Sequence, residues 1–316
     1  MSGRAEKEAK IEKKINTILE SCPQIVKDYM LSTSNKQTSI TRLQYLRNIM
    51  KYINYMESIG VDIYTAKPMH IDRYRDNVIH HDGKTCGASS VNTKLSAVIS
   101  FYKFLLKNEL VTSIPCTNDM KIKIQEKENV VFMTDKEVKK VKDNIKKQKH
   151  NRYKMLTNRD YAIVTLGCST GMRVSEISNI DLSDIDFEAK EIKIVAKGNK
   201  TRTIYIGDNT IAALQEWLKD RPKFLKWGES DALFLSRNGN RISIDAIRHM
   251  LAAETEELDK HITPHKMRST CAMKLYDKTG DIYLTAQQLG HANVKNTMIY
   301  AKATEEKRRM AADLLD

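Results

Sequence analysis

The sequence predicts a mainly α-helical protein with one small β-hairpin, in which an α-helical domain is followed by a mixed α+β domain. Three observations support this prediction. Apolar residues recur three and four positions apart along most of the chain, as they do on one face of a helix. The period changes to two only within residues 191–206, where strands are expected instead. The length of 316 residues suits about two domains of roughly 150 residues each.

The first part of the chain is expected to hold a helical extension and a helical domain. Residues 1–20 alternate Lys and Glu around a few apolar residues, which predicts a short, solvated helix. Residues 21–115 contain three stretches with helical spacing. The first follows Thr38, a good N-cap residue, and the second is opened by Pro68, which suits the first turn of a helix. The third covers residues 91–105, so the block predicts one compact helical domain.

A break between the domains is expected at residues 116–133. This stretch has no strong period and follows Pro115, so it predicts an extended linker. Thr134 and Glu137 then have the spacing of a capping box, in which each residue's side chain bonds to the other's backbone N–H. We therefore expect the second domain to cover residues 134–316.

The second domain mixes helices with the hairpin. Residues 161–168 predict a buried helix that Gly171 breaks, and residues 174–180 continue as a helix. Residues 191–196 and 201–206 alternate in polarity and are joined by a short segment with Gly-Asn at its centre, which predicts a β-hairpin. Further helices are expected near residues 208–220, 243–256, 264–278, 281–289 and 303–315.

The charge of the chain indicates an anionic partner. Lys and Arg total 53 against 40 Asp and Glu, a formal net charge of +13. Residues 1–118 carry a net +6 and residues 119–316 a net +7, so no single tail holds the excess. A nucleic acid that touches both halves would explain this distribution. Compositional drift toward lysine is the alternative that charge alone leaves open.

Composition also excludes several classes of protein. The longest run free of charged residues, 282–294, is shorter than the ~20 residues of a membrane span. The N-terminus has no apolar stretch of the kind that secretory signals contain. The five cysteines are odd in number with no close pair, which argues for reduced thiols in the cytoplasm and against a disulfide framework or a zinc site. They are Cys22, Cys86, Cys116, Cys168 and Cys271.

The residues that could do chemistry are polar side chains placed beside breaks in the second domain. Each alone has an ordinary explanation, because a single arginine is usually a surface ion partner and a single tyrosine usually packs. They are Arg173, Lys197, His265, Arg268, His291 and Tyr300.

Four stretches place these residues in a fixed order. They are TGMRVSEI (170–177), VAKGNKTRTIYI (195–206), TPHKMRST (263–270) and LGHANVKNTMIY (289–300). Their order and spacing resemble the tyrosine recombinase, or phage integrase, family. Residues 89–115 are similar to that family's core-binding domain. The resemblance implies a simple two-domain recombinase, with a helical DNA-binding domain and a mixed α+β catalytic domain. Ser269 departs from the family, in which many members carry a histidine there.

The resemblance assigns all six residues to the active site, with Tyr300 as the nucleophile. The chemistry suits these residue types. A phosphodiester needs fixed cations around it, and Arg173 and Arg268 are always charged and can each grip two oxygens. His265 and His291 can donate hydrogen bonds to the same oxygens or accept a proton.

The implied reaction is cleavage and rejoining of DNA through a covalent intermediate. Tyr300 would attack phosphorus and form a 3′-phosphotyrosine, which conserves the energy of the phosphodiester. The leaving 5′-oxygen needs a proton, and Lys197 at the hairpin tip is the candidate general acid. No metal and no cofactor are expected.

The resemblance also implies partners. Two protomers would bind double-stranded DNA with an inverted-repeat core site, and two such dimers would form a tetramer, in the cytoplasm of a bacterium. The last helix, with Met310, Leu314 and Leu315, would dock on a neighbouring protomer or else pack on its own domain. Glu176 follows Arg173 by about one helical turn, so it either orients that arginine or is an ordinary surface carboxylate.

Two other functions stay open. A type IB topoisomerase uses similar Arg, Lys, His and Tyr chemistry but relaxes supercoils without exchanging partners. A DNA-binding regulator without catalysis is the other, although the complete set of six polar residues argues against it. Within recombination, the sequence fits a mobile genetic element, a plasmid or a chromosome-dimer role equally well.

Overall fold

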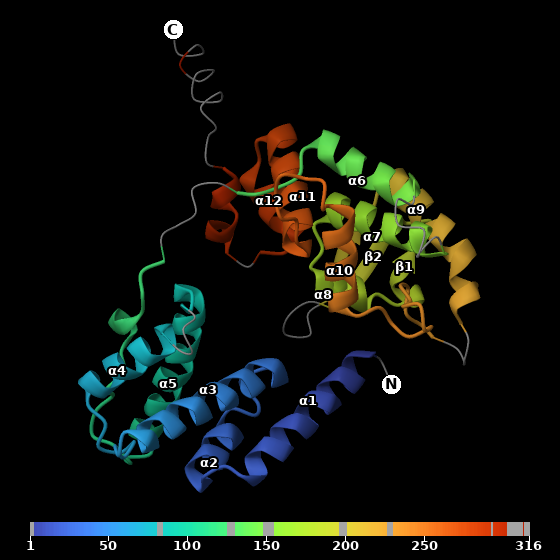
Figure 1. The fold of residues 1–316 in the computed structure, drawn as a ribbon. Helices are drawn as coiled ribbons and strands as arrows, with labels where there is room; N and C mark the ends of the chain where they lie inside the picture. The colour runs from blue at the N-terminus through green and yellow to red at the C-terminus, as the bar shows by residue number, and fades with distance from the viewer. Residues whose placement is uncertain are drawn as a thin grey trace. The chain divides into compact units, whose positions relative to one another are not determined.

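The computed structural model forms two compact units, residues Met1–Glu126 and Lys127–Asp316. It describes residues 3–80, 85–124, 130–147, 155–195, 201–225, 230–291, 293–301 and 312. Figure 1 shows the helices of both units and the short strands of the second.

Every regular element among the described residues of the first unit is a helix. Its elements are α1 (Gly3–Glu20), α2 (Gln24–Ser32), α3 (Ser39–Ser58), α4 (Pro68–Ile79), α5 (Ala88–Lys107) and the short 3-10 helix η2 (Asn118–Met120). The helix starts expected at Thr38 and Pro68 are confirmed. Thr38 caps α3 by accepting from the Thr41 N–H at 3.4 Å, and Pro68 is the first residue of α4.

The core of this unit lies where α3 packs on α5, with α1, α2 and α4 around that pair. Apolar residues three and four apart on α3 are fully buried, among them Leu46 and Ile49. The α5 side of the contact buries Leu95, Val98 and Tyr102. A helix with one apolar face is stable only when that face is covered, which fixes this arrangement.

Helix α1 differs from the solvated helix that the sequence predicts. Ile15 is fully buried in the core of the first unit, and Ile11 and Ile18 pack against the same core. These residues form a stripe at helical spacing, which α1 turns toward α3. Arg42 of α3 also forms an ion pair with Glu12 of α1, with 2.7 Å between Nη1 and Oε1. The charged residues between the apolar ones leave the stripe narrow, but it is wide enough to dock the helix.

The residues expected to form the linker pack largely onto one unit or the other. Cys116 is buried in the first unit, and the backbone of Ile122 exchanges two hydrogen bonds with the Asn92 side chain. At the other end Met133 is buried, and its N–H donates to Thr270 Oγ1 at 2.9 Å. Between these anchored ends, residues 125–129 lie outside the described residues. Side-chain and backbone contacts of this kind leave no periodic signal in the sequence.

The second unit is mixed α+β. Its helices are α6 (Asp135–Lys147), α7 (Thr157–Thr170), α8 (Val174–Asn179), α9 (Asp208–Asp220), α10 (Ile244–Glu254), α11 (Pro264–Thr279) and α12 (Ile282–Leu289). Short 3-10 helices occur at η4 (Leu182–Asp184), η5 (Arg221–Phe224), η6 (Val294–Asn296) and η7 (Met298–Tyr300). The strands are β1 (Ile185–Asp186), β2 (Glu191–Val195) and β3 (Thr201–Tyr205).

The centre of the second unit is α7, which packs against α6, α9 and α11. Its residues from Ala162 to Gly167 are all buried, as the continuous apolar run predicts. The strands form one antiparallel sheet in the order β1-β2-β3, with Ile192 opposite Ile204 and Ile194 opposite Arg202. The predicted hairpin is thus confirmed in its two strands, while its turn lies outside the described residues.

Two predicted boundaries of the second unit are confirmed. The Thr134 N–H donates to Glu137 Oε2 at 2.6 Å and the Glu137 N–H donates to Thr134 Oγ1 at 3.3 Å, which is the expected capping box. Gly171 ends α7 with a φ of 65°, which glycine adopts without steric cost. The helix expected at 303–315 lies outside the described part of the chain. Within the described helices, none is long and apolar enough to cross a membrane.

Candidate active site

The break after α7 brings two distant parts of the second unit together. A side chain at Gly171 would place its Cβ 2.7 Å from Cδ2 of Leu289, the last residue of α12. Glycine is therefore needed here for two reasons, its left-handed backbone conformation and this close approach. As a result Arg173, which follows the break, starts α8 beside the C-terminal end of α12, where His291 follows.

Arg268 holds this junction from α11. Its side chain is almost fully buried, and it donates to the Gly171 carbonyl at 2.7 Å and to the Leu289 carbonyl at 2.6 Å. Burial and the nearby Arg173 guanidinium lower the pKa of Arg268 to about 10. The group stays charged at neutral pH, in a place where that charge is poorly compensated.

Arg173 is oriented by Glu176. Nη1 of Arg173 donates to Glu176 Oε1 at 2.9 Å, and the backbone N–H of Arg173 donates to Oε2 of the same carboxylate at 2.8 Å. The Glu176 side chain is only 7% exposed, whereas that of Arg173 is 44% exposed. The carboxylate is therefore a buried anchor and the guanidinium faces solvent, as an arginine that receives a ligand must.

The two histidines have lowered pKa values, which favours the neutral imidazole at neutral pH, although the surface of His265 is exposed and His291 is only partly buried. Burial is the largest cause in both, and Arg268 and Arg173 add positive charge nearby. Together these effects lower the pKa of His265, and they lower the pKa of His291 to about 4. His291 Nδ1 forms a hydrogen bond of 2.7 Å with Thr297 Oγ1, which fixes the ring. A neutral imidazole held in this way can donate a hydrogen bond or accept a proton.

Tyr300 lies in the same unit as the arginines. It ends η7, is almost fully buried, and packs with Ala272 of α11 and Leu289 of α12. Its side chain also acts electrostatically on the Arg268 guanidinium. The two neighbours in sequence, Met298 and Ile299, are exposed instead. A phenol and a buried guanidinium therefore share one site within a single chain.

The structure thus brings together five of the six residues that the sequence singled out. Arg173, His265, Arg268, His291 and Tyr300 are joined by the contacts and charges given above. Lys197 lies in residues 196–200, outside the described residues, as do Met310, Leu314 and Leu315 of the expected last helix.

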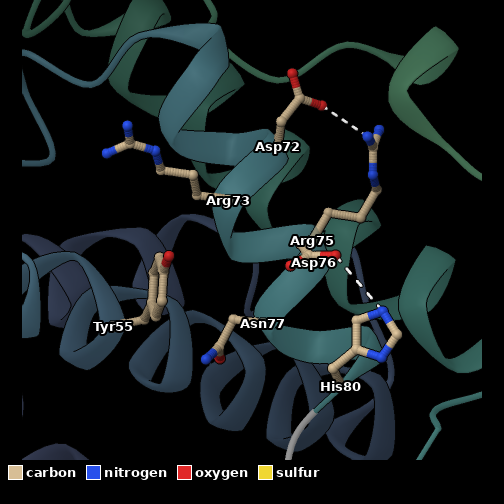
Figure 2. A pocket seen from close by; sticks show the side chains of 7 residues that line it. All are labelled: Tyr55, Asp72, Arg73, Arg75, Asp76, Asn77 and His80. Atoms are coloured by element: carbon tan, nitrogen blue, oxygen red, sulfur yellow. Dashed lines mark ion pairs between the residues drawn. The ribbon is translucent and has the colours of Figure 1, made fainter.

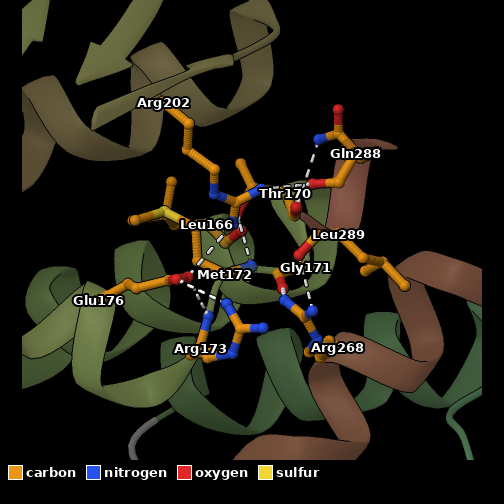
Figure 3. A network of polar contacts seen from close by, with 10 residues as sticks. All are labelled: Leu166, Thr170, Gly171, Met172, Arg173, Glu176, Arg202, Arg268, Gln288 and Leu289. Atoms are coloured by element: carbon orange, nitrogen blue, oxygen red, sulfur yellow. Dashed lines mark hydrogen bonds and ion pairs between the residues drawn. The ribbon is translucent and has the colours of Figure 1, made fainter. Parts of the chain in front are cut away.

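Sequence analysis missed Arg202, which also reaches this network. Its guanidinium bonds to Glu176 and to the carbonyl of Gln288. Figure 3 shows Arg202 beside Arg173 and Arg268, around the end of α7 and the end of α12. The alternation of the strand could have indicated this position. Arg202 is two residues from the buried Ile204, and residues two apart in a strand lie on the same face of the sheet.

The described hollows of the surface lie away from this network. One, shown in Figure 2, is open and lined by Tyr55, Asp72, Arg73, Arg75, Asp76, Asn77 and His80 of the first unit. Its carboxylates are taken by an Arg75–Asp72 pair of 2.9 Å and a His80–Asp76 pair of 3.6 Å. None of the residues proposed for chemistry lines it. Across the described chain, no cluster of three or more His, Cys, Asp or Glu could hold a metal ion.

Comparisons with known proteins match both units. Residues 127–307 match the phage integrase family, and residues 27–109 match the phage integrase N-terminal SAM-like domain. Tyrosine recombinase XerC of Pseudomonas putida is 30% identical over 263 residues, which cover 82% of this chain and 84% of that protein.

Solved structures share the fold. The XerH site-specific recombinase bound to palindromic difH substrate, in a post-cleavage complex, matches with a TM-score of 0.76 at 18% identity, over 98% of this chain and 90% of that one. The Tn1549 transposon integrase in complex with transposon right end DNA matches with a TM-score of 0.71 at 19% identity, over 92% and 99%. The family match covers more than half of the chain, and its motifs fall on the residues that the fold brings together: the chain belongs to the phage integrase family, the tyrosine recombinases.

Proposed function

We propose that this tyrosine recombinase cuts and rejoins DNA at specific sites, with Tyr300 as nucleophile and Arg173, Lys197, His265, Arg268 and His291 around the scissile phosphate. The observation that carries the proposal is the state of Arg268. It is buried, its two hydrogen bonds go to backbone carbonyls, and it lies next to a second arginine and the tyrosine.

A buried charge is costly unless a partner of opposite sign accompanies it. Glu176 is the nearby carboxylate, but its described hydrogen bonds go to Arg173 and Arg202. The positive charge of Arg268 is therefore left for a ligand. A DNA phosphate would supply the missing anion, and its developing negative charge in the transition state would be stabilised most.

The lowered pKa values of the histidines support the same interpretation. At neutral pH His265 and His291 are uncharged, so they add hydrogen bonds to the phosphate rather than further repulsion around the arginines. One of them can also accept the Tyr300 proton as the phenolic oxygen attacks.

The proposed step conserves bonds. The Tyr300 oxygen forms a bond to phosphorus while the bond from phosphorus to the 5′-oxygen breaks, and Lys197 gives that oxygen a proton. The product is a 3′-phosphotyrosine and a free 5′-hydroxyl, and the reverse attack by a 5′-hydroxyl rejoins the strand. The step uses no metal and no cofactor.

We also propose the partners. The substrate is double-stranded DNA with an inverted-repeat core site, bound by a dimer, and two dimers form the tetramer in which strands are exchanged. Residues 21–115 would serve as the core-binding domain, residues 134–316 as the catalytic domain, and the last helix as the contact to a neighbouring protomer. The solved relatives support this, since XerH and the Tn1549 integrase were each captured on DNA.

The same comparison supports a bacterial cytoplasmic protein associated with DNA, as the matched XerC comes from a bacterium. The five cysteines are free thiols in the structure.

A nicked suicide substrate tests the nucleophile. Cleavage of such DNA releases a short strand and traps the protein on the 3′-phosphate. We expect the wild-type chain to be trapped and Tyr300→Phe to bind the same DNA without being trapped. Tyr283→Phe is the matched control, because this tyrosine is exposed on α12. Trapping of the Tyr300→Phe protein would remove Tyr300 from its role.

A second substrate tests Lys197. Lys197→Ala should cleave slowly, and sulfur at the 5′-bridging position should restore the rate, because a thiolate leaves without a proton. If sulfur fails to rescue the variant, another group supplies the proton. Recombination between two marked sites separates the recombinase from a topoisomerase, which relaxes DNA without exchanging partners. A regulator without catalysis would give no covalent complex in any of these assays.

A further inference from the structure

We propose that Arg202 is a positioning residue that clamps the end of α12, and with it His291, to the carboxylate that orients Arg173. This inference rests on the proposed function, since it concerns how the active-site groups are held. We do not propose that Arg202 touches the phosphate. It joins β3 to two segments that each carry a residue of the site.

Two contacts form the clamp. Nη1 of Arg202 donates to the Gln288 carbonyl at 2.9 Å, near the end of α12. Nη2 pairs with Glu176 Oε2 at 3.3 Å. The Arg202 side chain is 18% exposed and Glu176 is 7% exposed, so both contacts are shielded from water. One guanidinium thus spans the distance between α8 and α12 (Figure 3).

The carboxylate of Glu176 is shared between two arginines. Oε1 accepts from Arg173 Nη1, and Oε2 accepts from the Arg173 backbone N–H as well as from Arg202. Removing Arg202 would leave this carboxylate with a single arginine and release the α12 side of the junction. The position of Arg173 and the position of His291 are therefore linked through one side chain.

The backbone next to His291 fits closely against Arg202. A Cβ at Gly290 would lie 2.7 Å from Nη1 and 2.8 Å from Cζ of Arg202. Gly290 also has a φ of 64°, so glycine is needed for both reasons. The guanidinium consequently packs against the residue that directly precedes His291. It fixes the start of the His291 segment, while Thr297 fixes the ring at the other side.

An arginine suits this position better than a lysine. Its planar group carries five donors in a fixed fork, so it can serve a carboxylate and a carbonyl at once. The ammonium of lysine is a point charge and would keep one partner at most in the same geometry. Arg202→Lys therefore tests whether bridging, and not charge alone, matters.

Arg241 provides a matched control in the same unit. Its side chain is 17% exposed, it pairs with Asp181, and it donates to the carbonyls of Ser178 and Ile180. Like Arg202 it joins a carboxylate to backbone carbonyls, but it touches none of the proposed active-site residues in the described structure. Arg202→Gln and Arg241→Gln should therefore lower the thermal unfolding temperature by similar amounts but differ in the rate of covalent trapping.

The experiment measures covalent trapping at saturating suicide DNA, together with DNA affinity and thermal unfolding. We expect Arg202→Gln to trap about 100-fold more slowly with DNA affinity nearly unchanged, since small displacements of reacting groups have effects of this size. Arg202→Lys should fall between that variant and the wild type. Arg241→Gln should trap at the wild-type rate. Glu176→Gln and Arg202→Gln remove the same contact. The double variant should therefore be slowed by less than the product of the fold-changes of the two single variants.

A second readout needs no DNA. The ring of His291 is titrated by NMR in the wild type, Arg202→Gln and Arg241→Gln. The charged and titratable groups that act on this ring are Arg268, Arg173, His265 and Arg202. Loss of one positive charge and of the clamp should raise the His291 pKa in Arg202→Gln, while Arg241→Gln should leave it unchanged.

The outcomes are separable. A wild-type chain that is never trapped, or a Tyr300→Phe protein that is, contradicts the proposed function, and the His291 titration still decides whether Arg202 holds that segment. A trapped wild type with an equally fast Arg202→Gln, or an unchanged His291 titration in that variant, overturns the clamp. Equal slowing by Arg202→Gln and Arg241→Gln overturns it too, because the effect would then be one of stability.

Discussion

The two units bury very different polar groups. The first unit fills its core with apolar side chains and tyrosines, and two of these tyrosines bond to each other and to the backbone. Tyr52 and Tyr102 share a hydrogen bond of 2.6 Å, and Tyr102 donates to the Ile63 carbonyl at 2.8 Å. Among its described residues the second unit instead buries three arginines: Arg159, Arg221 and Arg268.

The three buried arginines are not equivalent. Arg159 has a direct carboxylate partner, Asp160, at 2.6 Å, and it donates to the Leu235 carbonyl as well. Arg221 donates to the carbonyls of Ser230 and Ala232, and the carboxylate of Asp231 acts on it electrostatically. The Glu176 carboxylate acts electrostatically on Arg268 as well, but the positive charge of Arg173 outweighs it. Arg202 adds more positive charge, so Arg268 has other guanidiniums acting on it. The comparison teaches that burial of a guanidinium has more than one setting, and the cationic surroundings of Arg268 support the proposal that it receives an anion.

The strongest way to break this comparison is to replace the buried arginines in turn. Arg268→Met should reduce covalent trapping on suicide DNA by about a hundredfold to a thousandfold, the usual cost of removing one transition-state donor. Arg221 is buried to a similar degree and also donates to backbone carbonyls. Arg221→Met should therefore lower the thermal unfolding temperature, but the folded variant should be trapped on DNA at close to the wild-type rate. Equal trapping by the two variants would show that Arg268 is only structural.

The first unit offers a smaller effect, on stability alone. Tyr102→Phe leaves the Ile63 carbonyl and the Tyr52 hydroxyl without a partner, so urea unfolding should show a loss of about 1–3 kcal/mol. Tyr74→Phe is the matched control. Its buried hydroxyl has no hydrogen-bond partner among the described residues, so its removal should change the free energy of unfolding little. A large loss in Tyr74→Phe would mean that the hydroxyl does have a partner.

The pH dependence of unfolding sharpens the comparison further and is the smallest effect expected. The pKa of His291 is about 4 in the folded chain, below its ordinary 6.5, so the unfolded chain binds a proton that the folded one does not. The free energy of unfolding should therefore fall as pH is lowered from about 6.5 toward 4. His291→Gln should flatten that slope in urea titrations made at several pH values. Equal slopes in variant and wild type would mean that His291 is not buried as described.

The sequence alone predicted most elements of the fold because their signals are local. Caps such as Thr38 and Thr134, the break at Gly171 and the period change at the hairpin each depend on a few neighbouring residues. The helix α2 was missed, as nine residues after Pro23 give too few repeats of the helical period. The docking of α1 was missed too, since its narrow apolar stripe is interrupted by charges.

The candidate site divides in the same way. Residue types, order and spacing in four short stretches were enough to name Arg173, Lys197, His265, Arg268, His291 and Tyr300. They also offered Glu176 as a residue that could orient Arg173, three positions away, and the structure shows that contact. They could not show which arginine would be buried, or that Arg202 would join the network. Those features depend on contacts between segments up to a hundred residues apart, such as that of Arg268 with Gly171.

What the sequence by itself determined, then, is the set of chemical groups and the secondary structure that carries them, because both follow from neighbouring residues. The tertiary structure decided their electrostatic state. Only the meeting of α7, α11 and α12 buries Arg268, partly shields His291 from water and sets both beside other cations. That desolvation shifts their pKa values, and no local pattern in the chain encodes it.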